Sequence, residues 1–123
     1  MLLNLVKKLS KRNNSNSNYL FIGFSAEELG LLGSRYFVNS NLYDEGTYNM
    51  MINLDMVGRL NEKKELSVFG AGTSSIFRQV LNSLNGSFNL NIINDGTGPS
   101  DHTSFYNKDL PVLFFHTGSH ENY

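Results

Sequence analysis

The sequence predicts an α/β fold in which helices cover both faces of a largely parallel sheet. Short apolar segments typical of buried strands alternate along the 123 residues with segments whose apolar residues repeat at helical spacing. Several strand-like segments are followed directly by acids or glycines, as at the carboxyl ends of strands in open α/β sheets. This pattern leaves the strand order open, and a mixed sheet is compatible with it.

The first half of the chain predicts two helices around one strand. Met1 to Leu9 fits an amphipathic helix, and a polar, turn-prone linker follows from Asn13 to Asn18. Tyr19 to Phe24 is apolar and rich in aromatic and branched residues, which favours a buried strand. Leu29 to Val38 repeats apolar residues at helical spacing and predicts a helix. A loop covers residues 39–46.

The middle of the chain predicts two more strands and a helix. Tyr48 to Asp55 is an apolar strand that ends in an acid, and Glu65 to Phe69 is a further strand closed by glycines. Thr73 or Ser74 is a candidate N-cap for a helix that runs to about Asn85.

The last part of the chain completes the alternation. Phe88 to Ile93 predicts a short strand, and a Gly-Pro turn at residues 98–99 leads into a short helix. Leu110 to Phe115 is the last predicted strand. Pro111 stands at its start, where the missing N–H donor is tolerated.

Glu27 and Glu28 are adjacent acids between the first predicted strand and the helix that follows it. Two neighbouring carboxylates repel each other, and burying either one charged requires a cation or strong donors. Acids also commonly begin a helix, where they suit the positive end of its dipole. Their place at the carboxyl end of a buried strand favours a functional site. In such a site one carboxylate binds a divalent metal, and the other takes a proton from metal-bound water.

Asp55 ends the second predicted strand. An acid that stands alone there commonly terminates the strand or begins a turn. If the strands are parallel neighbours, Asp55 meets Glu27 and Glu28 at one edge of the sheet. Three acids without a basic partner repel one another, so the sequence predicts a metal ion among them.

Three histidines lie near the end of the chain. His102 directly follows Ser100 and Asp101, but consecutive residues cannot form a serine-hydrolase triad, whose members come from separate elements. We therefore expect Asp101 and His102 to line the site or to orient its carboxylates. His116 ends a strand and favours a structural role, and His120 lies in a polar tail as a ligand or a solvated side chain.

Four segments carry a resemblance to a known family. They are Phe-Ser-Ala-Glu-Glu-Leu-Gly-Leu-Leu-Gly-Ser (24–34), Asn-Leu-Asp-Met-Val-Gly-Arg (53–59), Gly-Pro-Ser-Asp-His-Thr-Ser-Phe-Tyr (98–106) and Phe-Phe-His-Thr-Gly-Ser-His-Glu-Asn-Tyr (114–123). Their sequences and order resemble the M28 family of zinc peptidases, the di-zinc aminopeptidases and their relatives. The resemblance covers Tyr19 to Tyr123. It implies a three-layer α/β/α sandwich with two zinc ions at the carboxyl ends of the central strands.

Matched residue by residue, the resemblance implies a role for each acid. Glu27 is similar to the general base that activates the bridging water, while Glu28 would bind one zinc ion and Asp55 the other. Tyr123 matches a tyrosine that helps to stabilise the tetrahedral oxyanion in some members. The implied activity is hydrolysis of the N-terminal peptide bond of a peptide with a free amino terminus.

Other residues of the family pattern are missing from this chain. The family supplies a histidine and a metal-bridging aspartate from a segment before the helix that Met1 to Leu9 resembles. Its last histidine ligand follows the tyrosine matched by Tyr123, so His120 falls three residues early and is not that ligand. We therefore expect residues 1–123 to form a single partial catalytic domain, without its N- and C-terminal parts, that is inactive alone.

Two alternatives to the peptidase stay open. One is a glutaminyl-cyclase-like transferase, which shares the fold and uses one zinc ion. The Glu27–Glu28 pair and the Ser-Asp-His segment at 100–102 favour the peptidase over it. The other is a non-catalytic module that keeps the fold and has lost ligands, and retention of Glu27, Glu28 and Asp55 argues against this.

Composition excludes several other classes. The net charge of −1 argues against a nucleic-acid partner, and the absence of cysteine excludes disulfides and cysteine zinc sites. No apolar stretch is long enough to predict a membrane-spanning segment, and no export signal is visible. The sequence leaves localisation open. Members of the resembled family are commonly exported to the periplasm or secreted, and any signal for export would lie upstream of Met1.

Overall fold

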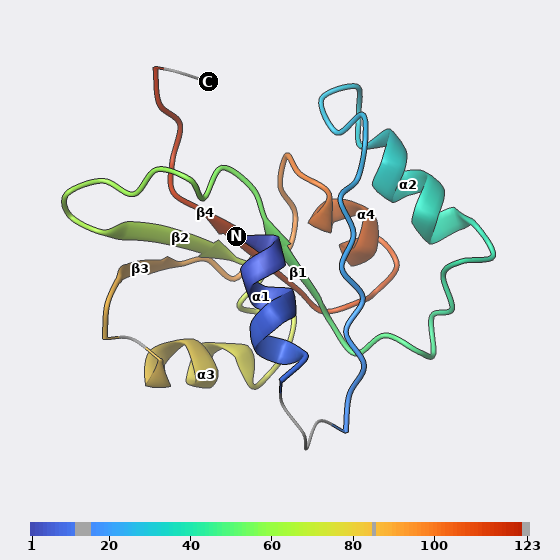
Figure 1. Cartoon of the computed structure of the whole chain (residues 1–123), viewed down its shortest axis with the longest axis horizontal. Helices are drawn as coiled ribbons and strands as arrows, with labels where there is room; N and C mark the ends of the chain where they lie inside the picture. Colours follow the sequence, from blue (N-terminus) through green and yellow to red (C-terminus); the bar gives the residue numbers. More distant parts are fainter. Residues whose placement is uncertain (12–15, 85, 122–123) are drawn as a thin grey trace.

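The computed structural model describes residues 1–11, 16–84 and 86–121 (Figure 1). Helices and strands are mixed along the chain, although α1 is followed directly by α2, and β1 by β2. The elements are α1 (Leu2–Leu9), α2 (Leu32–Asn39), β1 (Met51–Leu54), β2 (Glu65–Phe69), α3 (Phe77–Ser83), β3 (Asn89–Ile92), α4 (His102–Tyr106) and β4 (Val112–His116).

The four strands form one mixed sheet in the order β1-β4-β2-β3. β1 pairs in parallel with β4, and β2 pairs in parallel with β3, while β2 and β4 are antiparallel. Leu54 lies opposite Phe115, so β1 and β4 end at the same edge of the sheet. The N–H of Asp55 donates to the Phe115 carbonyl at 3.3 Å just beyond β1. We call this end of the two strands the carboxyl edge.

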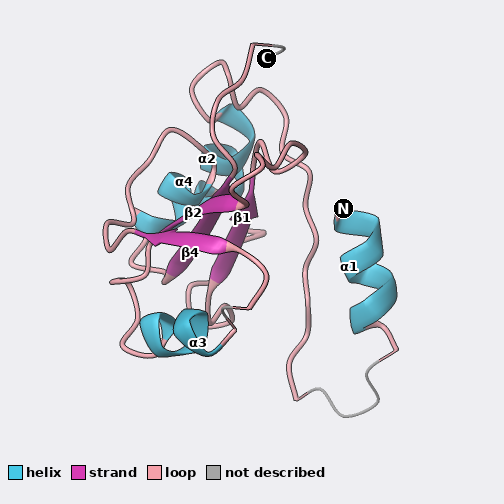
Figure 2. Cartoon of the chain, turned by 90° about the vertical axis from the view of Figure 1, so that its left-hand side faces the viewer, coloured by secondary structure: helices cyan, strands magenta, loops and turns pink. Residues whose placement is uncertain are grey.

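Helices cover both faces of the sheet (Figures 1 and 2). Alternate residues of β4 point to opposite faces. Leu113 belongs to one apolar cluster with Phe77 of α3. Val112 belongs to a second cluster with Phe105 of α4 and Val38 of α2. The two clusters define the predicted three-layer α/β/α arrangement.

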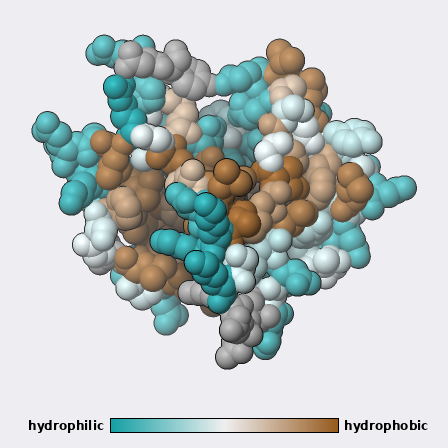
Figure 3. All heavy atoms as spheres, in the orientation of Figure 1, coloured by the Kyte–Doolittle hydropathy of each residue, from teal (hydrophilic) through white to brown (hydrophobic). Residues whose placement is uncertain are grey.

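The predicted N-terminal helix is present as α1, and it buries none of its residues. Leu3 is 77% exposed. Figure 3 shows exposed apolar residues at several places on the face of the molecule that is toward the viewer in Figure 1. Within the described ranges no helix has both the length and the apolar character to cross a membrane.

The prediction of a strand over Tyr19 to Phe24 is wrong, because the structure forms no strand there. A strand requires a neighbour to share its backbone hydrogen bonds, and no described strand pairs with this segment. Tyr19 and Leu20 are about half exposed. Phe24 instead packs on the ring of Phe105, with 5.9 Å between ring centroids. Phe24, the last apolar residue of the segment, therefore packs against α4 and does not form part of a strand.

The predicted cap of the third helix is also wrong. α3 begins after Ile76, and no side chain caps it. The Thr73 hydroxyl hydrogen bonds instead with the carbonyls of Gly70 and Val112. Thr73 therefore attaches the loop before α3 to the start of β4, and the predicted helix end at Asn85 lies outside the described residues.

Candidate active site at the carboxyl edge

Glu27 and Glu28 lie in a tight turn that leads into α2. The N–H groups of Gly30 and Leu31 both donate to the Glu27 carbonyl, at 3.0 and 2.8 Å. Ala26 and Leu31 have φ values of 55° and 60°, in the left-handed region that non-glycine residues seldom adopt. α2 begins only after Leu31 and has no acid in its first turn. The acids therefore do not serve to open the helix.

The start of α2 is fixed at two points. The N–H of Gly33 donates to the Ser25 carbonyl at 3.1 Å. A Cβ at position 33 would lie 2.6 Å from that oxygen, so only glycine allows this approach. The buried hydroxyl of Ser34 is 2.8 Å from that of Ser104 on α4. These contacts hold the turn with Glu27 against the helix that follows the Ser-Asp-His segment.

Asp55 directly follows β1 at the carboxyl edge. The Ser100 hydroxyl donates to its Oδ2 at 3.0 Å. Asn53 lies two residues before Asp55 on the same face of the strand, and its Nδ2 donates to the Ser100 hydroxyl at 2.8 Å. Met56, with φ 47°, is a further left-handed residue. Left-handed non-glycine residues therefore flank both Glu27 and Asp55, and such strain is common at functional sites.

Carboxylates from separate segments raise one another's pKa values. The pKa of Glu27 is raised by burial first, and then by the charges of Asp55, Glu28 and Asp101, with a smaller opposing effect from a hydrogen bond with Ser100. Burial and the charge of Asp55 also raise the pKa of Asp101. The structure thus brings together the acids that sequence reasoning placed at one edge, and adds Asp101 to them.

His102 is the first residue of α4 and is completely buried between this helix and the sheet. Its ring stacks on Phe114 with 4.3 Å between ring centroids. Burial lowers the pKa of His102 to about 4, although the Thr97 backbone and the charge of Asp55 oppose this shift. The imidazole is therefore neutral at physiological pH.

The other predicted site residues lie apart from these acids or outside the described ranges. His116 accepts a hydrogen bond at Nδ1 from the N–H of Gly118 at 3.0 Å, in keeping with a structural role. His120 lines a hollow together with Arg59. Tyr123 is outside the described residues.

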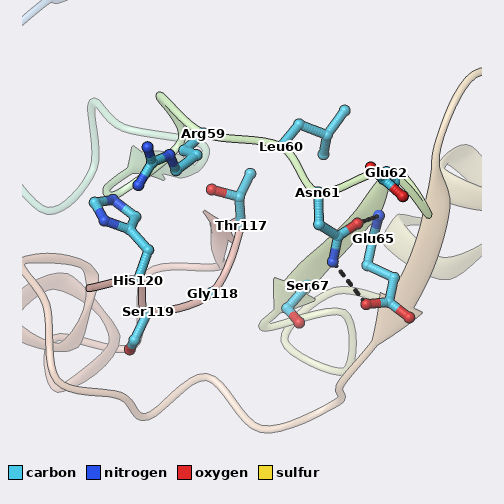
Figure 4. Close-up of a pocket in the computed structure, with 10 residues that line it drawn as sticks. All are labelled: Arg59, Leu60, Asn61, Glu62, Glu65, Ser67, Thr117, Gly118, Ser119 and His120. Atoms are coloured by element: carbon cyan, nitrogen blue, oxygen red, sulfur yellow. Dashed lines mark hydrogen bonds between the residues drawn. The ribbon is translucent and has the colours of Figure 1, made fainter. Parts of the chain in front are cut away.

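The hollow has a volume of about 540 Å³ and adjoins the carboxyl edge. In Figure 4 the His120 ring lies beside Arg59, and Asn61 hydrogen bonds with both the N–H and the side chain of Glu65. The hollow is bounded by the segments that follow β1 and β4, and by the start of β2. Its lining is Arg59, Leu60, Asn61, Glu62, Glu65, Ser67, Thr117, Gly118, Ser119 and His120.

The acids at the carboxyl edge suit zinc in kind, but within the described residues Glu27, Glu28 and Asp55 are not placed to hold one ion together, so the prediction of a metal ion among these three is wrong. Carboxylate oxygens bind zinc, and their mutual repulsion favours a cation. A catalytic zinc ion generally has three protein ligands. Across residues 1–11, 16–84 and 86–121, no group of three or more His, Cys, Asp and Glu side chains is placed to hold a metal ion.

Ligand sites in open α/β sheets commonly lie at the carboxyl ends of strands, and Asp55 lies at such an end with Glu27 and Asp101 close enough to affect one another's pKa values. Residues 1–123 match Peptidase family M28, and the chain belongs to this family. The resemblance seen in the sequence is thereby confirmed.

Solved structures of aminopeptidases are similar to this chain. The LapA aminopeptidase of Legionella pneumophila is 26% identical, with a TM-score of 0.63 over 85% of this chain and 31% of LapA. BSAP, a zinc aminopeptidase from Bacillus subtilis, is 33% identical, with a TM-score of 0.60 over 80% of this chain and 25% of BSAP. The chain thus spans about a quarter to a third of the length of these relatives.

Sequence reasoning missed three polar residues that build the site. Asn53 connects Ser100 and His102, and Ser34 with Ser104 connects α2 to α4. Asn53 could have been found as the polar residue inside an apolar strand, on the same face as Asp55. No signal in the sequence distinguishes the buried serines from surface serines.

Proposed function

We propose that this chain is part of the catalytic domain of a zinc aminopeptidase, with Glu27 as its general base. The observation that carries the proposal is the position of Glu27 in a strained turn, where burial and neighbouring acids raise the pKa of its carboxyl group. A carboxylate with a raised pKa is a better proton acceptor near neutral pH. Membership of the M28 family supports the same role.

Glu28 and Asp55 are the proposed ligands of two different zinc ions, and further ligands would come from outside the described residues. Zinc held there would polarise the scissile carbonyl and lower the pKa of a bound water. Glu27 would take the proton of that water and pass it to the leaving amine. Ser100 donates to Asp55 and also interacts with Glu27, so it keeps base and ligand in a fixed relation. Tyr123 is proposed to stabilise the oxyanion.

The proposed substrate is a peptide with a free amino terminus. The acids around Glu27 create a negative field, which attracts an ammonium group. The hollow beside Arg59 and His120 adjoins the same edge and offers space for a neighbouring part of the peptide. BSAP and LapA are described as aminopeptidases, which supports this class of substrate.

The direct test uses a protein that carries this chain together with the remaining ligands. Incubated with zinc and peptides, it should release free N-terminal amino acids, and N-acetylated peptides should be resistant. A chelator should stop the release, and zinc should restore it. Pyroglutamate formed from N-terminal glutamine would favour the cyclase alternative, and no turnover of either substrate would favour a non-catalytic module.

Residues 1–123 alone should bind zinc weakly. They supply only two proposed ligands, for two different ions, whereas a catalytic zinc generally needs three. Isothermal titration of this polypeptide should therefore show no sub-micromolar zinc affinity, and aminoacyl anilides should not be cleaved. Tight zinc binding together with anilide turnover would contradict the expectation that this part of the protein is inactive alone.

A further inference from the structure

The His102 ring is enclosed by its neighbours and does not line an open pocket. It is fully buried against Phe114, and within the described residues its Nε2 makes no hydrogen bond of ordinary geometry, while the Thr97 backbone interacts with the ring. A Cβ on Gly98 would lie 2.7 Å from this nitrogen, so position 98 must be glycine for the ring to fit. The Gly98 N–H donates to Thr103 Oγ1 at 3.0 Å, which fixes the loop around the ring.

Asn53 and Ser100 connect His102 to Asp55 by hydrogen bonds, and each of these bonds has only one possible donor. The Asp55 and Glu27 carboxylates only accept, so Ser100 directs its single proton at carboxylate oxygens, with Oδ2 of Asp55 at 3.0 Å. The Ser100 oxygen then accepts from Asn53 Nδ2, and this assigns the orientation of the Asn53 amide. The same amide nitrogen is 3.4 Å from Nδ1 of His102. Nδ1 must therefore accept, which leaves the ring proton on Nε2.

We propose that His102 is a positioning residue that fixes the orientation of the Asp55 carboxylate through Asn53 and Ser100. The proposal rests on the proposed function, in which Asp55 is a zinc ligand. A neutral ring with its lone pair at Nδ1 holds the Asn53 amide in one orientation. That amide in turn leaves the Ser100 proton no acceptor other than a carboxylate. Outer partners of this type commonly affect metal affinity about 10- to 100-fold.

The first test examines the hydrogen bonds from His102 through Asn53 and Ser100 to Asp55 in the absence of metal. Long-range proton–nitrogen NMR correlations of the 123-residue chain at pH 7 should show His102 as the neutral ring with its proton on Nε2. Asn53→Leu removes the amide at similar volume, and it should shift the Nδ1 resonance of His102. A ring protonated at Nδ1, or an Nδ1 resonance that Asn53→Leu leaves unchanged, would overturn the proposal.

The second test separates positioning from space-filling. His102→Phe keeps a ring to stack on Phe114 and removes the acceptor. His102→Asn is smaller, but its amide oxygen can replace Nδ1 as the acceptor. The carboxyl-carbon resonance of Asp55 should move in the Phe variant and return toward its original position in the Asn variant. The proposal fails if the Asp55 resonance is the same in both variants as in the parent, and Asn53→Leu supplies the comparison if His102→Phe does not fold.

The third test measures zinc affinity by competition with a chromophoric chelator, in a protein that carries the complete set of ligands. His102→Phe should lower the affinity about 10- to 100-fold, and His102→Asn should recover part of the loss. Equal affinity in the parent and the Phe variant would overturn the link to the metal site. If the parent itself binds no zinc, the proposed function fails, and the two NMR tests still decide the role of His102.

Discussion

Replacing Glu27 with Gln should remove nearly all peptidase activity from a zinc-loaded protein that carries this chain. Gln has the same shape but cannot accept the water proton, and general-base catalysis contributes about 10²- to 10⁴-fold to the rate. We therefore expect kcat to fall by about that factor with KM and zinc content little changed. Steady-state kinetics with an aminoacyl anilide, together with metal analysis, measure the effect.

The matched control is Glu45→Gln, which makes the same chemical change on an exposed loop residue. This variant should keep the parent kcat. Glu27→Gln should also fold at least as well as the parent, because it removes one member of a group of mutually repelling acids. A loss of kcat smaller than about tenfold in Glu27→Gln would rule out its assignment as the general base.

Burial of His102 should make the free energy of unfolding strongly pH-dependent below pH 6.5. Its pKa falls from an ordinary value of 6.5 to about 4 in the folded chain, so the unfolded chain binds the proton first as the pH falls. The stabilisation is complete above pH 6.5 and is lost progressively toward pH 4. A shift of this size corresponds to a loss of about 3 kcal/mol. Urea unfolding at a series of pH values measures it.

Two nearby acids, Glu27 and Asp101, change the free energy of unfolding with pH in the opposite direction. The raised pKa values of Glu27 and Asp101 mean that their contribution is present at low pH and is lost as the pH rises through those values. Comparison of the parent with His102→Phe isolates the histidine, because both proteins keep the acids. The difference in unfolding free energy between them should change by about 3 kcal/mol from pH 7 to pH 4. A difference that is constant with pH would contradict a buried neutral imidazole.

Elements with strong local signals could be predicted from the sequence. Glu65 to Phe69 is a strand with the predicted bounds, because its apolar residues and the turns around it define it locally. Tyr19 to Phe24 has an equally strong strand pattern and forms none, since a strand also needs a neighbouring strand to pair with. The local residue pattern therefore shows that a segment is able to form a strand, and the presence of a neighbouring strand determines whether the strand forms.

Asp55 could be predicted in the same way, because it directly follows β1. Glu27 and Glu28 are singled out by the family motif, since the strand expected before them does not form. The residues that orient these acids could not be predicted. Asn53 and Ser100 are 47 positions apart, and their hydrogen bond exists only because α4 packs over β1. Burial of His102 likewise depends on its stacking with Phe114 on a third element, β4. Such contacts depend on tertiary packing, which a single sequence does not specify.

The left-handed residues Ala26 and Met56 are positions where a substitution that stabilises the fold would lie directly beside Glu27 or Asp55. Glycine adopts this conformation without the steric cost that L-residues meet, which is about 1–2 kcal/mol per residue. Glycine at either position would relieve that cost and loosen the backbone beside Glu27 or Asp55. Selection for a higher melting temperature alone would therefore favour changes directly beside the proposed general base and zinc ligand. With Glu27 and Asp55 in these roles, we expect a gain in thermal resistance at Ala26 or Met56 to lower the catalytic rate.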